Sequence, residues 1–239
     1  NVLPPASSYS KDLIVAEIGS PMELVDCQPT ETYLAEASDA LAWLGDSMFS
    51  DHSYKNKRGH ALVIAGSESY SGAAVLAGNA AMRSGVGLVT LAVPAAIRSE
   101  VAARALPDLI VRSFDDGGEV DIAADAVLIG CGLDANDSAN EAMFRKVVEE
   151  RTTPVIVDAG GLWFFRGLTT DSVQPPATAG VSDLILTPHE GEFLRLLGKT
   201  DKDAIKDRVA AVHEFATANN IVLVLKGERV LIGAPDGRV

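Results

Sequence analysis

The chain is short of basic residues, and this shortage argues against two kinds of partner. It has 20 Lys and Arg against 33 Asp and Glu, which gives a formal net charge of −13 at pH 7. Nucleic acids and anionic membrane surfaces favour basic proteins. We therefore expect no nucleic-acid partner and no membrane partner.

Cysteine and long apolar runs are also scarce. The two cysteines, Cys27 and Cys131, lie far apart and follow no metal-ligand spacing, which favours ordinary thiols of a cytoplasmic protein over a disulfide. No apolar run approaches the roughly 20 residues that span a bilayer. No signal-peptide pattern is visible, and a chain that begins at Asn1 is expected to be cut at its front end.

Several common catalytic motifs are missing. The sequence has no GxxxxGK[ST] phosphate loop, no GxGxxG before a helix and no HExxH. Ser67 and Ser71 lack the surroundings of a nucleophile elbow. These absences disfavour hydride transfer on a dinucleotide fold and serine hydrolysis, and we assign no metal ligands.

The stretch 59–94 organises the rest of the chain. Apolar residues 61–65 predict a buried strand, residues 66–72 form a loop of small and polar residues, and the Ala-rich run 73–84 predicts a helix that stops at Gly85. A second strand is expected over 87–93, so the pattern is β-α-β with parallel strands. The loop lies where open α/β sheets bind ligands, and the helix start suits an anion. A tight turn that binds nothing fits the loop equally well.

The same alternation continues to the end of the chain and predicts an α/β fold. Further strands are expected over 108–111, 125–129, 154–157, 183–186 and 221–225, with a hairpin strand over 229–232. Helices are expected over 96–105, 137–151, 162–165, 190–197 and 203–218. Near the front, 13–18 predicts a strand, 30–44 a helix and 46–58 a linker. The strand ends are small or polar and should share one edge of the sheet, which predicts one extended cleft for two ligands.

Three of these strand ends carry residues that suit chemistry. Asp158 can hold a magnesium ion, a ribose hydroxyl or a substrate amide, or it can cap the next helix. His189, fixed in direction by Pro188, is favoured as a ligand contact, whereas Glu190 and Glu192 suit the helix dipole. Lys226 can meet a diphosphate, or it can be a solvated lysine at a hairpin.

Five segments in this order resemble the ADP- or ATP-dependent NAD(P)H-hydrate dehydratases, which have a ribokinase-like fold. They cover about residues 55–237 and read AGSESYSGAAVLAGNAAMRSGVGLVTLAVP, IGCGLD, VIVDAGGL, LTPHEGEFLRLLG and VLVLKGERVLI. The stretch LIVAEIGSP resembles the last strand of the NAD(P)H-hydrate epimerase domain found in bifunctional bacterial proteins. The expected domains are therefore an epimerase-like tail (1–26), a connecting helix and linker (27–58) and an incomplete dehydratase domain (59–239).

The resemblance implies a repair reaction. NADH or NADPH hydrated on its nicotinamide ring is phosphorylated on the new hydroxyl, and loss of phosphate restores the dihydronicotinamide. The implied phosphoryl donor is ADP or ATP with Mg²⁺. The resemblance to bifunctional bacterial proteins favours ADP. The implied fold is a mainly parallel sheet with helices on both faces, truncated here at its C-terminus, and we expect a homo-oligomer.

The resemblance also assigns binding residues. Ala73, Gly132 and His189 match positions that contact the hydrate, and Asp158 is placed with them. The nucleotide-binding positions are Lys226, Gly227, Glu228, Arg229 and Val230. The catalytic base is expected in a GTGD motif beyond Val239, so the chain as given would be inactive.

The chain departs from the family pattern in three places. It reads Asp158-Ala159-Gly160 where DAD is usual, GCGLD where GPGLG is common, and Tyr54-Lys55-Asn56 where His-Lys-Gly is usual. These departures affect details of the hydrate pocket more than the class of protein.

Two other functions compete with hydrate repair. A vitamin-precursor kinase of the same fold would phosphorylate a small alcohol, but such kinases do not carry an epimerase-like tail. A nucleotide-binding protein without turnover would have another residue in place of the expected GTGD aspartate.

Overall fold

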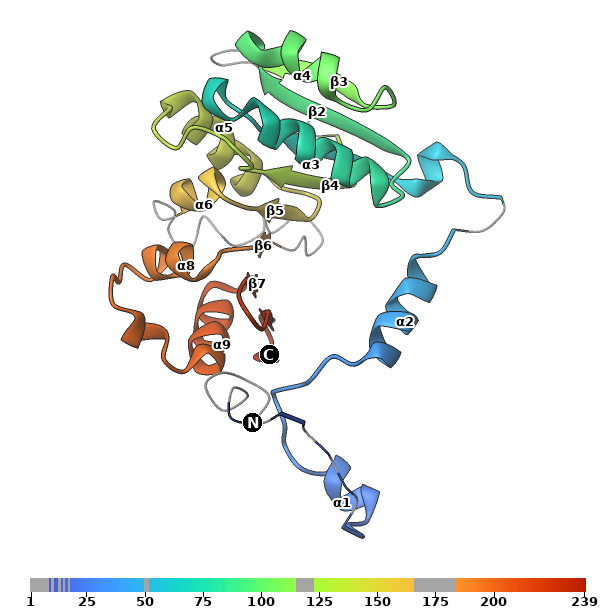
Figure 1. The fold of residues 1–239 in the computed structure, drawn as a ribbon, viewed down its shortest axis with the longest axis vertical. Coiled ribbons are helices and arrows are strands. Elements are labelled where there is room, and N and C mark those ends of the chain that lie inside the picture. Colours follow the sequence, from blue (N-terminus) through green and yellow to red (C-terminus); the bar gives the residue numbers. More distant parts are fainter. Residues whose placement is uncertain are drawn as a thin grey trace.

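An eight-stranded sheet forms the centre of the molecule (Figure 1). The computed structural model describes residues 9, 11–12, 14, 16, 18–49, 52–114, 123–165 and 184–239. The strands are β1 (His60–Ile64), β2 (Leu88–Pro94), β3 (Ile110–Phe114), β4 (Ala126–Ile129), β5 (Val155–Val157), β6 (Leu184–Leu186), β7 (Val222–Leu225) and β8 (Leu231–Gly233). Their order is β3-β2-β1-β4-β5-β6-β7-β8, and all neighbours are parallel except β7 and β8.

The apolar runs of the sequence become the buried strands. Leu62, Val63 and Ile64 of β1 are at most 1% exposed, as expected for a strand covered on both faces of a parallel sheet. The strands predicted from 59 onward are confirmed, with ends shifted by a residue or two for most and by two to three for β3. The antiparallel pairing of β8 confirms the predicted hairpin.

Helices pack on both faces of the sheet. Val63 belongs to a core cluster beneath α3 (Ser71–Arg83) and α4 (Arg98–Arg104). Its neighbours Leu62 and Ile64 point the other way, because side chains alternate along a strand. They join a second cluster, which includes residues of α5 (Ser138–Glu149), α6 (Gly160–Phe165), α8 (Glu190–Leu196) and α9 (Arg208–Asn219). The predicted α/β architecture with helices on both faces is confirmed.

Two expected helices begin with a separate 3₁₀ turn. The helix expected over 96–105 is η4 (Ala95–Ile97) followed by α4, and that expected over 203–218 is η5 (Lys202–Ile205) followed by α9. Asp207 explains the second break, because its Oδ1 accepts a hydrogen bond from the Ala210 amide at 3.0 Å and so caps α9. Among the described residues, no helix is long and apolar enough to cross a membrane.

The front of the chain corrects two predictions. Residues 30–36 are not helical. The Tyr33 amide donates to the Val239 carbonyl at 2.8 Å, and the Val239 amide donates to the Glu31 carbonyl at 2.7 Å, so this segment pairs as extended backbone. The helix α2 (Ala37–Ser47) starts only where the Glu36 amide donates to Asp39 Oδ2. Of the strand expected over 13–18, Ile14 and Ile18 are exposed and belong to no strand, while Leu13, Val15 and Glu17 lie outside the described residues.

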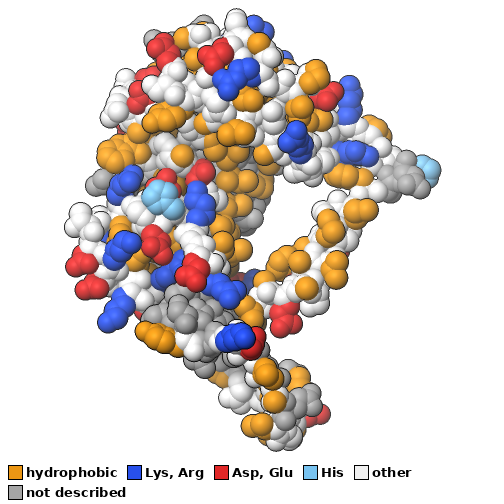
Figure 2. Space-filling view, viewed as in Figure 1, with side chains coloured by type: hydrophobic (Ala, Val, Ile, Leu, Met, Phe, Trp, Pro, Cys, Tyr) orange, Lys and Arg blue, Asp and Glu red, His pale blue; other side chains and the backbone are white. Residues whose placement is uncertain are grey.

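The segment with α2 stands apart from the body of the molecule. Besides α2 it contains α1 (Met22–Asp26), and α2 has no buried residue. The chain rejoins the body at η2 (Lys55–Arg58), where the Gly87 amide donates to the Arg58 carbonyl at 3.3 Å. Figure 2 shows apolar side chains along this arm, separated from the body over most of its length. The sequence also predicts a loop over 169–182, which has two prolines, and an Asp- and Gly-rich turn near 115–119; both lie outside the described residues.

Candidate functional site

The chain reverses its direction across the sheet at β1. From β1 it proceeds outward to β2 and β3, and it then returns to place β4 on the other side of β1. The loops that leave the carboxyl ends of β1 and β4 therefore diverge to opposite faces. In open α/β sheets this switch point is where ligands bind.

A cavity of about 580 Å³ lies at this switch point. It is lined by the loop after β1, the end of β2 and the loop after β4: Ser67, Glu68, Ser69, Tyr70, Pro94, Ala96, Leu133, Asp134, Ala135, Asn136, Asp137 and Asn140. These described lining residues include three carboxylates and no Lys or Arg. The cavity therefore favours a neutral, hydrogen-bonding part of a ligand over a phosphate group.

One hydroxyl in this cavity has no partner among the described residues. Ser67 Oγ is buried and finds no hydrogen-bond partner there. A buried polar group without a partner is unfavourable, so a water molecule or a ligand should bond to it. The sequence interpretation rejected Ser67 as a nucleophile and did not consider it as a binding group.

Ala73 and Gly132 meet beside this cavity. Gly132 has a φ of +74°, and a Cβ placed on it would lie 2.7 Å from the Ala73 Cβ. Only glycine combines that backbone conformation with such a close approach. The loop after β4 is thereby held against the first turn of α3, and two of the sequence-predicted site residues are neighbours.

Asp158 and Lys226 form an ion pair. Asp158 follows β5 and Lys226 follows β7, so the lysine reaches past the end of β6 to place its Nζ 2.7 Å from Asp158 Oδ1. The lysine side chain is 42% exposed and the aspartate side chain 26% exposed. The cap that was one alternative for Asp158 is not what its carboxylate does here.

Cys131 lies close enough to this ion pair for both of its charges to affect the pKa of the thiol. Burial, and next the negative charge of Asp158, raise the pKa of the Cys131 thiol to about 11, against a smaller opposite effect of Lys226. The thiol is therefore neutral at pH 7. The sequence marked this position only by its departure from GPGLG.

His189 caps α8 through its side chain. Its Nδ1 accepts hydrogen bonds from the Gly191 and Glu192 amides at 3.0 and 3.3 Å, and Glu192 Oε2 accepts from the His189 amide at 2.8 Å. This reciprocal arrangement is a capping box. With Nδ1 used as an acceptor, the hydrogen of the neutral ring is on Nε2, and the side chain is 55% exposed.

The backbone joins His189 to Lys226. The Lys226 amide donates to the Pro188 carbonyl at 2.8 Å, and His189 and Lys226 form a parallel bridge beyond the ends of β6 and β7. Glu190 and Glu192 lie in the first turn of α8, which confirms their structural interpretation. His189, Asp158 and Lys226 thus share the carboxyl edge of the sheet.

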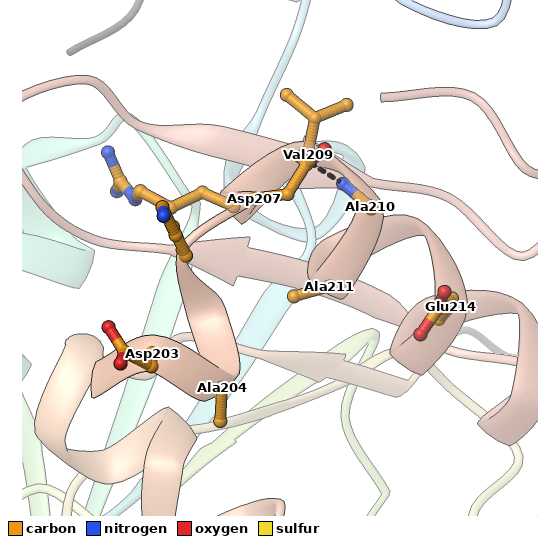
Figure 3. Close-up of a pocket in the computed structure, with 9 residues that line it drawn as sticks. Asp203, Ala204, Asp207, Val209, Ala210, Ala211 and Glu214 are labelled. Carbon is orange, nitrogen blue, oxygen red and sulfur yellow. Dashed lines mark hydrogen bonds between the residues drawn. The ribbon is translucent and has the colours of Figure 1, made fainter. Parts of the chain in front are cut away.

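The single extended cleft remains a prediction. The described lining of the switch-point cavity includes neither His189 nor Lys226. A second hollow, of about 610 Å³, lies over the start of α9 and is lined by residues of both charges (Figure 3). In that view Asp203 and Glu214 lie at well-separated positions around it, and the dashed line marks the Asp207 cap.

Comparison with known proteins first identifies the class. The structure superposes with a TM-score of 0.66 on a ribokinase-like superfamily protein from Enterococcus faecalis, at 24% identity over 78% of this chain and 64% of that one. The fold is therefore ribokinase-like. Residues 61–239 match the family described as NAD(P)H-hydrate dehydratase, and the chain belongs to this family.

Relatives with known names agree. A bifunctional NAD(P)H-hydrate repair enzyme from Moorella thermoacetica is 34% identical over 254 aligned residues, which cover all of this chain and 46% of that protein. An ADP-dependent (S)-NAD(P)H-hydrate dehydratase from Neisseria meningitidis is 32% identical over 80% of this chain and 63% of its own length. The chain thus spans less than half of the first relative and under two thirds of the second.

A solved structure of a family member is also similar. The ADP/ATP-dependent NAD(P)H-hydrate dehydratase from Bacillus subtilis, co-crystallised with ATP and Mg²⁺, superposes with a TM-score of 0.66 at 30% identity. The match covers 80% of this chain and 65% of that one.

Proposed function

We propose that the full-length protein containing this chain dehydrates NADH hydrate and NADPH hydrate to NADH and NADPH, at the expense of ADP. The family match over residues 61–239 is the observation that carries this proposal. The geometry supports it in two ways: the cavity at the switch point, whose described lining has carboxylates and no Lys or Arg, suits the uncharged hydrated ring, and Lys226 supplies a positive charge farther along the same edge.

The proposed chemistry has two steps. The ring hydroxyl takes the terminal phosphoryl group of ADP and loses its proton, and AMP leaves. The carbon–oxygen bond to the new phosphate then breaks while a proton leaves the neighbouring carbon, which restores the ring double bond. We assign Ala73, Gly132, His189 and Asp158 to the hydrate side, and the segment Lys226–Val230 to the nucleotide.

Mg²⁺ is expected to enter with the nucleotide. No group of three or more potential metal-ligating side chains occurs among the described residues, and the Asp158 carboxylate is already paired with Lys226. This donor set fits an ion held mainly by phosphate oxygens and water, with at most one carboxylate from the described part of the chain. When bound, the ion would neutralise charge on the transferred phosphoryl group.

The test is the return of NADH absorbance at 340 nm. The full-length protein is incubated with NADH hydrate, Mg²⁺ and either ADP or ATP, and NADPH hydrate is run in parallel. Hydrate repair predicts a nucleotide-dependent rise in absorbance with release of AMP or ADP. A vitamin-precursor kinase would instead leave absorbance unchanged and phosphorylate a small alcohol, and failure with both nucleotides would reject the proposal.

We propose three further properties of the whole protein. The relative from Moorella thermoacetica, whose match covers all of this chain, is named as bifunctional, so we infer that the full-length protein also carries an NAD(P)H-hydrate epimerase domain. We expect it to act in the cytoplasm as a homo-oligomer. Size-exclusion chromatography with light scattering, and interconversion of the two hydrate epimers without nucleotide, test the assembly and the second activity.

A further inference from the structure

Arg208 lies directly beneath the loop that follows β7. It is the first residue of α9, and its side chain is only 14% exposed. A Cβ placed on Gly227 would lie 2.7 Å from Arg208 Nη2, so the Gly227 backbone packs against the guanidinium. Any larger residue at 227 would have to displace this side chain.

The guanidinium joins three elements. Its Nη2 donates to the Arg229 carbonyl at 3.1 Å, which ties α9 to the loop after β7. Its Nε lies 3.5 Å from Oε1 of Glu190, in the first turn of α8. This Nε is buried and has no hydrogen-bond partner among the described residues, so the Glu190 contact is an ion pair without a close hydrogen bond.

The burial of this charge calls for a reason. Removing a guanidinium from water is unfavourable unless its interactions compensate. Arg208 is not needed to cap α9, because the Asp207 side chain does so. The planar guanidinium has hydrogen-bond donors in fixed directions, and these can hold a backbone segment in one conformation.

We propose that Arg208 is a positioning residue that fixes the backbone of residues 226–230 and, through Glu190, couples it to the start of α8, where His189 lies. This inference rests on the proposed function, in which residues 226–230 hold the adenine nucleotide. Arg208 itself is not assigned a contact with the nucleotide. Its loss loosens the nucleotide segment and leaves the cavity at the switch point unchanged.

The binding test uses Arg208→Lys and Arg208→Gln in the full-length protein. Calorimetric titration with ADP and Mg²⁺ is expected to show a Kd raised about tenfold in both variants, since a change of position at a binding group has effects of this order. Lysine keeps the charge but cannot reach both the Arg229 carbonyl and Glu190 with fixed geometry, so it should rescue little. The KM for NADH hydrate should rise less than the ADP Kd, because Ala73 and Gly132 are held by other elements and only His189 and Asp158 adjoin the loosened segment.

A matched control separates this role from the general loss of an arginine pair. Arg145 pairs with Glu141 at 2.8 Å within α5, remote in sequence from the β7 loop. Arg145→Gln is expected to leave the ADP Kd unchanged. An equal loss of ADP affinity in the control and in Arg208→Gln would overturn the proposal.

A second readout does not need the nucleotide. Amide hydrogen exchange of residues 227–230 in the nucleotide-free protein should be faster in Arg208→Gln than in wild type, with unchanged exchange in β1 and α3. If wild type binds neither ADP nor ATP, the proposed function fails, and this measurement still decides whether Arg208 orders the segment. Unchanged exchange together with an unchanged ADP Kd rejects the positioning role.

Gly227→Ala tests the same contact from the side of the loop after β7. The added methyl group meets Arg208 Nη2, so Gly227→Ala should weaken ADP binding in the wild-type background. In the Arg208→Gln background the same change should cost less, because the shorter side chain leaves room. Additive effects of the two changes would contradict direct packing between them.

Discussion

At the scale of single residues, the pair of Asp158 and Lys226 bears most directly on the site. Asp158→Asn removes the charge that holds the lysine Nζ at 2.7 Å. Because both side chains are partly exposed, we expect the free energy of unfolding to fall by no more than about 1 kcal/mol. Turnover with ADP should fall about tenfold or more, because the ammonium is no longer held in place.

The kinetic parameters separate two roles for Asp158. A raised KM for ADP indicates that it orients Lys226, and a raised KM for the hydrate indicates a direct substrate contact. Asp236→Asn is the control, since Asp236 pairs with Arg238 at 2.8 Å on the surface outside the site. Wild-type kinetics in Asp158→Asn would contradict both roles.

Cys131 offers a test of the local environment. Its raised pKa, about 11, keeps the thiol neutral at pH 8.5, so alkylation by iodoacetamide should be slower than at the exposed Cys27 by about 10- to 100-fold. Peptide mass mapping after timed quenching measures both rates in one sample. In urea the two rates should converge, and equal rates in the folded protein would show that Cys131 is not shielded.

The same shift sets the direction of a pH effect on stability. The unfolded thiol ionises near its ordinary pKa of about 9, whereas the folded thiol stays neutral up to about 11. Between these values the unfolded state binds fewer protons, so this group's contribution to stability is present below pH 9 and is lost as the pH rises toward 11.

At the scale of elements, His189 caps α8 and is proposed to contact the hydrate, and substitutions can separate these two roles. His189→Ala removes the acceptor that caps α8, and the expected loss of stability is about 1 kcal/mol. His189→Asn keeps a side-chain acceptor at the cap and should recover most of that loss. If Nε2 also contacts the hydrate, the KM for the hydrate rises in both variants, and thermal unfolding together with steady-state kinetics distinguishes the two effects.

The strands from β1 onward were predictable for a physical reason. A parallel strand buried on both faces needs a continuous apolar run, and runs such as 61–65 and 221–225 allow few other structures. The breaks between the 3₁₀ turns and the two helices were harder to predict. A side-chain cap such as Asp207 starts a new helix there, but the apolar pattern of the sequence continues through the break. The late start of α2 depends on pairing between residues 31–33 and Val239, which are distant in sequence.

The candidate site was predictable in outline and not in its contacts. Strand-end positions placed Asp158, His189 and Lys226 on one edge, as the topology requires. The Asp158–Lys226 pair joins strands that are not neighbours, and no spacing in the sequence indicates it. Arg208 carries no sequence signal at all, because its position under Gly227 exists only after α9 and the β7 loop have packed.

At the scale of the whole molecule, the reversal of strand order at β1 divides the edge into two regions. The first, at β1 and β4, has carboxylates and no Lys or Arg among its described lining residues, whereas the second, at β5 to β7, carries the Lys226 ammonium. Charge thus differs along one edge, which suits a neutral acceptor and an anionic donor held side by side. No single residue or element could provide this separation.

The arm that carries α2 gives the last prediction. Leu41 and Trp43 are 69% and 61% exposed and α2 has no buried residue, so this helix contributes little to the stability of the body. Limited chymotrypsin digestion of the full-length protein should therefore cut first within residues 33–49, as shown by the masses of the fragments. The fragment that begins after the cut should keep a thermal midpoint within about 3 °C of the uncut protein, because few packing contacts are lost.

Resistance of α2 at a protein concentration where an oligomer forms, with cleavage on dilution, would instead show that a second copy covers the apolar arm. Resistance at every concentration would contradict the exposed arm itself.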